Sequence, residues 1–428
     1  MAKNKKTHIM VIPFPQSGHM LPTVDLVHHL LRRHAAVTVV LTPNNLHYLD
    51  PLLRIHSPEN LRPLSFPFPS HPSIPSGVEN MSQLPTHAIG DMIQAFSLLR
   101  HPLSSWLESS PDPPAAILSD MFSVPWTNKL AEEFEIKSIA FLPTTAHTLS
   151  VIWGQDDRGF FEELMQSTST SWGLILNTFK ELEEKYVEDL KKNFMGHHRV
   201  WPVGPILPPA AGSDEDRGGK SSVPVGELTA WLDAFPENSV VYVAFGSQVS
   251  MGKAQGEAIA AALEKSGVRF IWAVKKSGGD DTAEIVPRGF EERTAERGRV
   301  IRGWAPQKVI LEHRAVGSYL THLGWGSVLE GLIGGTVLLA WPMHADNHFN
   351  TKLLADELGA AVKVCDGMDS VPDSDELARV LADSVRVDLP ERGKAVELRG
   401  MGLAAIDEGG SSYKALDDMV REVGTSAV

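Results

Sequence analysis

The sequence predicts an α/β protein of two domains, each built on a parallel sheet covered by helices. At 428 residues the chain is too long for one ordinary domain. Short runs of β-branched and apolar residues alternate with amphipathic stretches in both halves, which is typical of parallel strands joined by helices. Residues 207–227, dense in Pro, Gly, Ser and charge, separate the halves as a linker would.

The expected strands follow in chain order. In the first domain, residues 1–206, they fall near 7–13, 36–42, 115–119, 137–142, 173–177 and 199–203. In the second domain, residues 228–408, they fall near 239–245, 268–274, 299–302, 316–321, 336–340 and 361–364. The proline-rich stretch 61–77 is expected to form no regular structure. Its Phe66, Phe68 and Ile74 still need burial, either against the core or along a pocket.

Composition and charge exclude several classes of function. A net charge of −14 disfavours a nucleic-acid partner. The single cysteine, Cys365, allows no internal disulfide and fits a reducing compartment. The first apolar run breaks at Pro13, too early for a secretory signal, and no stretch approaches the roughly 20 apolar residues of a membrane span. We therefore expect a soluble, cytosolic protein. Composition does not indicate its oligomeric state, and we expect a monomer that acts on small molecules.

The stretch THLGWGSVLEG, residues 321–331, is typical of a phosphate-binding turn. A strand ending at Thr321 and a helix beginning near Gly326 would place backbone N–H groups and a positive helix end at the sheet's carboxyl edge. His322 and Ser327 can add donors there. A dinucleotide fingerprint would need glycine where Leu329 stands, and the sequence has no P-loop pattern. An ordinary turn with a capping serine is the alternative.

Residues 304–347, WAPQKVILEHRAVGSYLTHLGWGSVLEGLIGGTVLLAWPMHADN, resemble the C-terminal signature box of plant family-1 UDP-dependent glycosyltransferases. The resemblance extends from PFPQSGH near the start to EGGSSYKALDDMV near the end. It implies the GT-B arrangement, two Rossmann-like domains facing across a cleft, with the acceptor mainly on the first and the donor on the second. It also implies that the C-terminal helix, within 409–428, crosses back to the first domain. Some closure on donor binding is expected.

The resemblance assigns roles around the donor. Trp304 would stack on uracil, Gln307 would lie near the ribose, and Glu330 would accept both ribose hydroxyls. His322, Ser327 and Ser247 would hold the diphosphate, and Asp346 with Asn347 the sugar hydroxyls. The complete donor set that it implies is Gly18, Pro143, Thr144, Ser247, Trp304, Ala305, Gln307, His322, Trp325, Gly326, Ser327, Glu330, Asp346 and Asn347.

Two further positions match the catalytic residues of the family. His19 follows PFPQSG at the start of a helix, and Asp120 ends an apolar strand, so both should lie at the carboxyl edge of one sheet. By resemblance His19 is the general base and Asp120 its partner. A surface or capping role for His19, and an N-cap role for Asp120 before Val124, are the alternatives.

The reaction implied is direct displacement with inversion, without metal or cofactor, the UDP-sugar being a co-substrate. Covalent catalysis would want a carboxylate nucleophile, which the resemblance does not supply. The histidine pairs 28–29 and 197–198 lack metal-ligand spacing and are read as surface residues.

The sugar is predicted from two departures from the family pattern. Gly326 replaces the usual asparagine, and Asn347 replaces the glutamine of glucose-using members, which withdraws the amide by about 1.5 Å. The whole chain is most similar to flavonol 7-O-rhamnosyltransferases, so we expect UDP-rhamnose as donor. The acceptor, a flavonol with its 7-hydroxyl, would contact Phe66, Phe68 and Phe122.

Two alternatives stay open. Thr144 could bond the glucose 6-hydroxyl that rhamnose lacks, which favours a UDP-glucose-dependent glucosyltransferase of flavonoids or other phenols. A non-catalytic nucleotide-sugar-binding protein is more remote, because both His19 and Asp120 are present.

Overall fold

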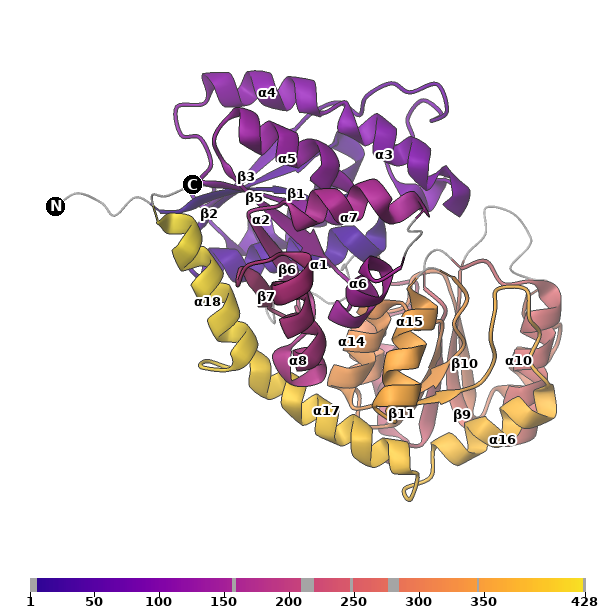
Figure 1. Cartoon of the computed structure of the whole chain (residues 1–428). Helices are drawn as coiled ribbons and strands as arrows, with labels where there is room; N and C mark the ends of the chain where they lie inside the picture. The colour runs from indigo at the N-terminus through magenta and orange to yellow at the C-terminus, as the bar shows by residue number, and fades with distance from the viewer. Residues whose placement is uncertain are drawn as a thin grey trace. The chain divides into compact units, whose positions relative to one another are not determined.

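The computed structural model describes residues 6–155, 159–208, 219–246, 249–275, 285–344 and 346–425. The chain divides into two units, Met1–Gly212 with Ala404–Val428, and Ser213–Leu403. Each unit holds one sheet in which the paired strands run parallel. The expected strands are all present, with their ends shifted by one or two residues. In Figure 1 the first unit is coloured indigo to magenta, with its C-terminal segment in yellow, and the second unit runs from pink through orange to yellow.

The sheet of the first unit has the order β3-β2-β1-β4-β5-β6-β7. Its strands are β1 His8–Ile12, β2 Ala36–Leu41, β3 Leu61–Ser65, β4 Ala116–Asp120, β5 Lys137–Leu142, β6 Gly173–Leu176 and β7 Val200–Pro202. Its helices are α1 Ser17–Arg32, α2 Asp50–Ile55, α3 Ile89–Ser97, α4 Arg100–Ser109, α5 Val124–Glu133, α6 Ala146–Trp153, α7 Glu162–Ser169, α8 Lys180–Asp189 and α18 Ser411–Gly424.

Strand β3 corrects the expectation that residues 61–77 form no regular structure. Leu61–Ser65 pairs in parallel with β2, with Pro63 opposite Val39. Because β3 is the edge strand, Pro63 can turn its nitrogen, which lacks a hydrogen, away from the ladder. Proline is excluded from central strands but is tolerated in an edge strand. The sequence alone did not show that this strand lies at an edge.

Side chains of β1 alternate between the two faces of the sheet. Ile9 and Val11 pack with α1 and α18 in one hydrophobic cluster, whereas Met10 and Ile12 pack with residues of α3, α4 and α5 in another. This period of two is what a strand buried on both faces requires. The sheet is therefore covered by helices on both sides.

The C-terminal helix α18 is fixed to the first unit by polar contacts as well as by packing. Lys137, 4% exposed, directs its ammonium group at the carbonyls of Glu422 and Thr425, at 2.9 and 2.6 Å. A cation at the C-terminal end of a helix complements the helix dipole. Trp201 of β7 also donates to Asp418, at 3.0 Å, so the helix lies against that strand (Figure 1).

The sheet of the second unit has the order β10-β9-β8-β11-β12-β13, the doubly wound order of a dinucleotide-binding domain. Its strands are β8 Val240–Val243, β9 Arg269–Val274, β10 Gly298–Arg302, β11 Val316–Thr321, β12 Val337–Ala340 and β13 Ala361–Lys363. Its helices are α9 Val225–Asp233, α10 Lys253–Ser266, α12 Phe290–Thr294, α13 Gln307–Glu312, α14 Trp325–Gly334, α15 Asn347–Thr351 and α16 Ser374–Ser384. Helix α17, Pro390–Ile406, ends just after the chain re-enters the first unit.

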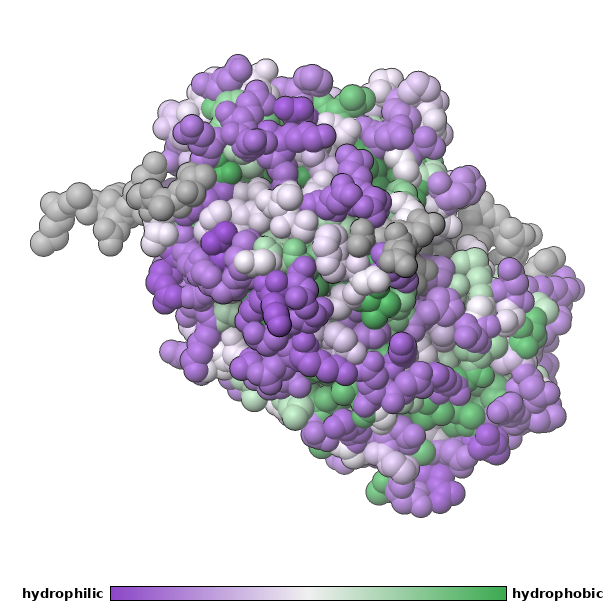
Figure 2. Space-filling view, in the orientation of Figure 1, coloured by the Kyte–Doolittle hydropathy of each residue, from purple (hydrophilic) through white to green (hydrophobic). Residues whose placement is uncertain are grey.

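Hydrophilic residues predominate on the face shown in Figure 2, with hydrophobic residues in small scattered groups. Within the described ranges, no helix is both long and apolar enough to cross a bilayer.

Candidate active site

His19 and Asp120 lie where the strand order of the first sheet reverses. The chain runs from β1 to β2 and β3 on one side, and from β4 to β5, β6 and β7 on the other. Open α/β sheets bind ligands at the carboxyl ends of the strands on either side of this point. His19 lies in the first turn of α1, just after β1, and Asp120 is the last residue of the neighbouring β4.

The two side chains are in direct contact. His19 Nδ1 lies 2.8 Å from Asp120 Oδ2, and the exposed fractions of the side chains are 16% and 0%. The other carboxylate oxygen accepts the N–H of Phe122 at 3.1 Å, which starts the turn Met121–Ser123 before α5. Asp120 therefore serves both as partner of His19 and as a cap. With Nδ1 donating to the carboxylate, Nε2 is the basic nitrogen of the ring.

Aromatic rings surround this imidazole. The ring centroids of Phe122 and Phe14 lie 4.8 and 6.1 Å from that of His19. Phe66, Phe68 and Phe122 are all partly buried against the cluster that contains Phe14. Of the three predicted acceptor residues, Phe122 is the one placed beside His19.

The predicted sugar-rim residues Pro143 and Thr144 form the turn between β5 and α6. The start of α6 is capped twice: Thr145 Oγ1 accepts the N–H of Thr148 at 2.8 Å, and Glu183 of α8 accepts two further N–H groups. Those groups belong to Ala146 and His147, at 3.2 and 2.8 Å. No motif in the sequence marks this buried carboxylate, which fixes the turn that carries Thr144.

His322 lies at the reversal point of the second sheet, between β8 and β11. Its ring packs between two glycines: a Cβ on Gly246 would come within 2.7 Å of the ring, and one on Gly324 within 2.5 Å. Leu323, the residue between His322 and Gly324 in the chain, adopts a left-handed φ of 61°. Burial away from water lowers the pKa of His322 to about 3, and the nearby His344 contributes a smaller lowering. The ring is thus neutral at pH 7. Ser247, also predicted here, lies outside the described residues.

Helix α14 begins directly after this turn, with Gly324 as its N-cap. The first N–H groups of a helix have no partner within the helix, so they and the helix dipole favour an anion. Trp325 is buried, whereas Gly326 is exposed and Ser327 partly so. A Cβ at Gly326 would meet nothing within 4 Å, so its lack of a side chain is not required by packing.

Trp304 is held by Ser222, in the C-terminal part of the predicted linker 207–227. Its N–H donates to Ser222 Oγ at 2.9 Å, and its carbonyl accepts the N–H of Ser222 at 2.8 Å. The carbonyl of the next residue, Ala305, accepts the N–H of Gln307, which starts α13. The predicted uracil platform and the predicted ribose residue therefore lie on one short, well-bonded loop.

Gln307 contacts Glu330 and two tyrosines. Its Nε2 donates to Glu330 Oε2 at 2.6 Å and lies 3.4 Å from Ser327 Oγ. Its Oε1 accepts the hydroxyls of Tyr319 and Tyr242, at 3.1 and 3.4 Å. In the sequence both tyrosines look like ordinary strand residues, because a tyrosine in an apolar strand is usually part of the core.

Asp346 and Asn347 lie at the start of α15. Asn347 is 2% exposed, and its Oδ1 accepts the N–H of His344 at 3.2 Å. Asp346 Oδ2 accepts the amide of Asn350 at 3.0 Å. The buried Asn347 side chain therefore stabilises the turn between β12 and α15 through its bond to His344.

His28, His29 and His197, which were predicted to be surface residues, are all only partly exposed. His28 Nδ1 lies 2.9 Å from His56 Nε2, and His29 Nε2 lies 2.9 Å from the carbonyl of Leu207. His198, by contrast, is exposed as expected. In the part of the chain that the structure describes, no three His, Cys, Asp or Glu side chains form a metal-binding group.

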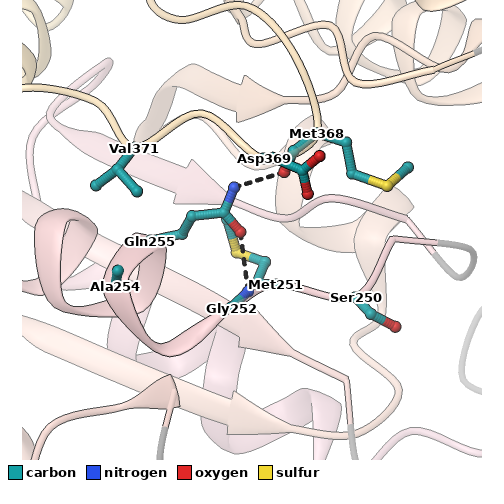
Figure 3. A pocket seen from close by; sticks show the side chains of 8 residues that line it. All are labelled: Ser250, Met251, Gly252, Ala254, Gln255, Met368, Asp369 and Val371. Carbon is teal, nitrogen blue, oxygen red and sulfur yellow. Dashed lines mark hydrogen bonds between the residues drawn. The ribbon is translucent and has the colours of Figure 1, made fainter.

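A hollow of about 320 Å³ at the start of α10 is lined by none of these residues (Figure 3). Gln255 bridges it, accepting the N–H of Gly252 and donating to the carbonyls of Met368 and Ser370. The Gln255 amide thus connects α10 to the loop after β13 by hydrogen bonds.

Two α/β units with parallel sheets, a His–Asp pair at the reversal point of one and a helix N-terminus at the reversal point of the other, are what a glycosyltransferase of the GT-B class is expected to have. The model of the UDP-glucoronosyl and UDP-glucosyl transferase family matches residues 198–385. The chain is 58% identical to flavonol 7-O-rhamnosyltransferase of Arabidopsis thaliana over 98% of both chains. It is 45% identical to flavonol 3-O-glucosyltransferase UGT89B1 of the same plant, over 98% of this chain and 97% of that one.

Solved structures agree. The crystal structure of Arabidopsis thaliana UGT89C1 complexed with UDP-L-rhamnose matches with a TM-score of 0.93 and 57% identity, over 99% of this chain and 100% of the other. The same enzyme complexed with quercetin matches with a TM-score of 0.90. The chain belongs to family 1 of the UDP-dependent glycosyltransferases, and the GT-B fold is confirmed.

Proposed function

We propose that this chain transfers rhamnose from UDP-rhamnose to a phenolic hydroxyl of a flavonol, at the 7-position, with inversion at the anomeric carbon. The contact of 2.8 Å between His19 and Asp120 carries the chemical part of this proposal. The likeness to a flavonol 7-O-rhamnosyltransferase and to a structure complexed with UDP-L-rhamnose supports the substrates.

His19 acts as the general base. Nε2 removes the proton of the phenolic hydroxyl as its oxygen attacks the anomeric carbon. The imidazolium that forms is stabilised by Asp120, which is fully buried and therefore screened little by water. Phe122 beside the imidazole offers an apolar surface for a flat aromatic acceptor.

The donor site holds the leaving group. As the bond from the anomeric carbon to the diphosphate breaks, negative charge grows on UDP. The N-terminal end of α14, Ser327 and the neutral imidazole of His322 donate hydrogen bonds to that charge. Trp304 stacks on uracil and Glu330 accepts the ribose hydroxyls.

The choice of sugar rests on Asn347. Its Oδ1 is engaged by the N–H of His344, and its side chain is nearly inaccessible. An amide used in this way is poorly placed for a sugar hydroxyl, so glucose loses a contact that a longer glutamine could make. Asp346 is then the polar side chain of this turn that contacts the sugar.

A glucose-using enzyme is the second candidate. Thr144 lies in the turn at the sugar's rim, and a relative of 45% identity is named as a 3-O-glucosyltransferase. A hydroxyl at that position can bond the glucose 6-hydroxyl, which rhamnose lacks.

The test is a competition between the two donors. Purified protein receives equimolar UDP-rhamnose and UDP-glucose with kaempferol or quercetin, and the products are identified by mass spectrometry and NMR. We expect mainly a 7-O-rhamnoside whose anomeric configuration is opposite to that of the donor. Thr144→Val is the matched variant: it should reduce any glucoside formed and leave the rhamnoside rate unchanged. A predominant glucoside would refute the assignment of the sugar.

A further inference from the structure

Two buried tyrosines donate hydrogen bonds to the amide oxygen of Gln307. Tyr242 of β8 and Tyr319 of β11 are opposite each other in register, with rings stacked at 5.0 Å and exposed fractions of 1% and 0%. Both hydroxyls reach the same acceptor, at 3.4 and 3.1 Å. A buried hydroxyl needs such a partner, since leaving it unpaired is costly.

These contacts fix which way the amide of Gln307 faces. With its oxygen on the tyrosines, its NH₂ group points at Glu330 Oε2, 2.6 Å away. In the reversed orientation the amide oxygen would face a carboxylate oxygen at that distance, with no proton between them. The tyrosine hydroxyls would at the same time lose the Gln307 oxygen as acceptor. Burial raises the pKa of both phenols, so both keep their protons.

We propose that Tyr319, assisted by Tyr242, is a positioning residue for nucleotide binding: it orients Gln307 so that Gln307 holds the Glu330 carboxylate toward the ribose hydroxyls. This inference rests on the proposed function, in which Glu330 binds the ribose. The shorter of the two contacts makes Tyr319 the main contributor. Because both tyrosines are buried beneath Gln307, their effect passes through the amide and the carboxylate.

The test compares UDP with 2′,3′-dideoxy-UDP, which lacks both hydroxyls that Glu330 would bind. Isothermal titration calorimetry gives the Kd of each ligand for the wild type and for Tyr319→Phe. We expect Tyr319→Phe to raise the Kd of UDP about fivefold, the usual value of one neutral hydrogen bond, and that of the dideoxy ligand less than about twofold. At saturating donor, kcat should change less than about twofold while KM for the donor rises.

Equal weakening of both ligands would mean a packing defect and would overturn the inference, as would an unchanged Kd for UDP. Tyr242→Phe is a second variant, with a smaller selective loss expected from its longer contact. Tyr413→Phe, on α18 in the other unit, is the matched control and should alter neither Kd. A wild type that binds both ligands equally would refute the ribose role of Glu330, and one that binds no UDP would refute the donor site itself.

Discussion

The pairing of His19 with Asp120 illustrates how far single residues could be predicted. Each was expected at the carboxyl end of a strand, and parallel strands that are neighbours bring such residues together. Sequence alone could not supply the neighbourhood of β1 and β4, which came from the resemblance to a family. The contact at 2.8 Å, and the second bond from Asp120 to Phe122, are what the structure adds.

Asp120→Asn tests the partner of the base. An amide keeps the shape of the carboxylate but removes the charge that stabilises the imidazolium and can reverse the tautomer of His19. We expect kcat at saturating substrates to fall by about 10²-fold or more. The matched control is Asp112→Asn, which alters another histidine–aspartate pair, with His8 at 3.7 Å, and should leave kcat unchanged. A loss below about threefold would contradict the role of Asp120.

The residues that sequence reasoning missed are those that act through another side chain. Tyr319, Tyr242 and Glu183 resemble ordinary strand or helix residues in the sequence. Their importance comes from the atom they meet in the folded chain, a Gln307 oxygen or the N–H groups at the start of α6. A pattern of residue types carries no information about such contacts unless the chain's topology is already known.

At the scale of elements, the alternation of strands and helices was predicted because each buried strand is a short apolar run bounded by turn residues. Strand β3 was missed because Pro63 was weighed as though every strand were central. The positions of α1 and α14 after their strands were predictable, and these two helix starts carry His19 and the predicted phosphate-binding turn.

The C-terminal half of α1 contains two histidines, His28 and His29, whose pKa values are lowered. His28, close to His29, His56 and Arg32, has its pKa lowered from 6.5 to about 4, mainly because it is withdrawn from water. Above pH 7 His28 is neutral in both the folded and unfolded states. As pH falls from 6.5 toward 4, the unfolded chain gains a proton that the folded chain does not, so stability must fall.

His28→Asn should therefore flatten the pH dependence of stability. The variant loses its bond to His56 and will be less stable at pH 7.5, but its urea midpoint should drop less than that of the wild type between pH 7.5 and 5. The exposed His198→Asn is the control and should keep the wild-type slope. If His28→Asn and the wild type show identical slopes, this explanation is wrong.

At the scale of the whole molecule, each unit is expected to supply a separate part of the reaction. The first unit carries His19, the proposed base, and the second carries the residues assigned to uracil, ribose and diphosphate. The family, the fold and the donor class follow from the signature box together with full-length relatives. The choice of sugar depends on one or two hydroxyl contacts near Asn347 and Thr144. The fold therefore indicates the nucleotide of the donor but not its sugar.

The most direct test of this division is one variant measured in two ways. His19→Ala should lower kcat for flavonol rhamnosylation by about 10²- to 10⁴-fold, because the general base is lost. Its Kd for UDP should stay within about twofold of the wild-type value, since none of the residues assigned to the nucleotide is changed. A kcat above about one tenth of the wild-type value, at unchanged protein stability, would contradict the central claim that His19 is the base of this transferase.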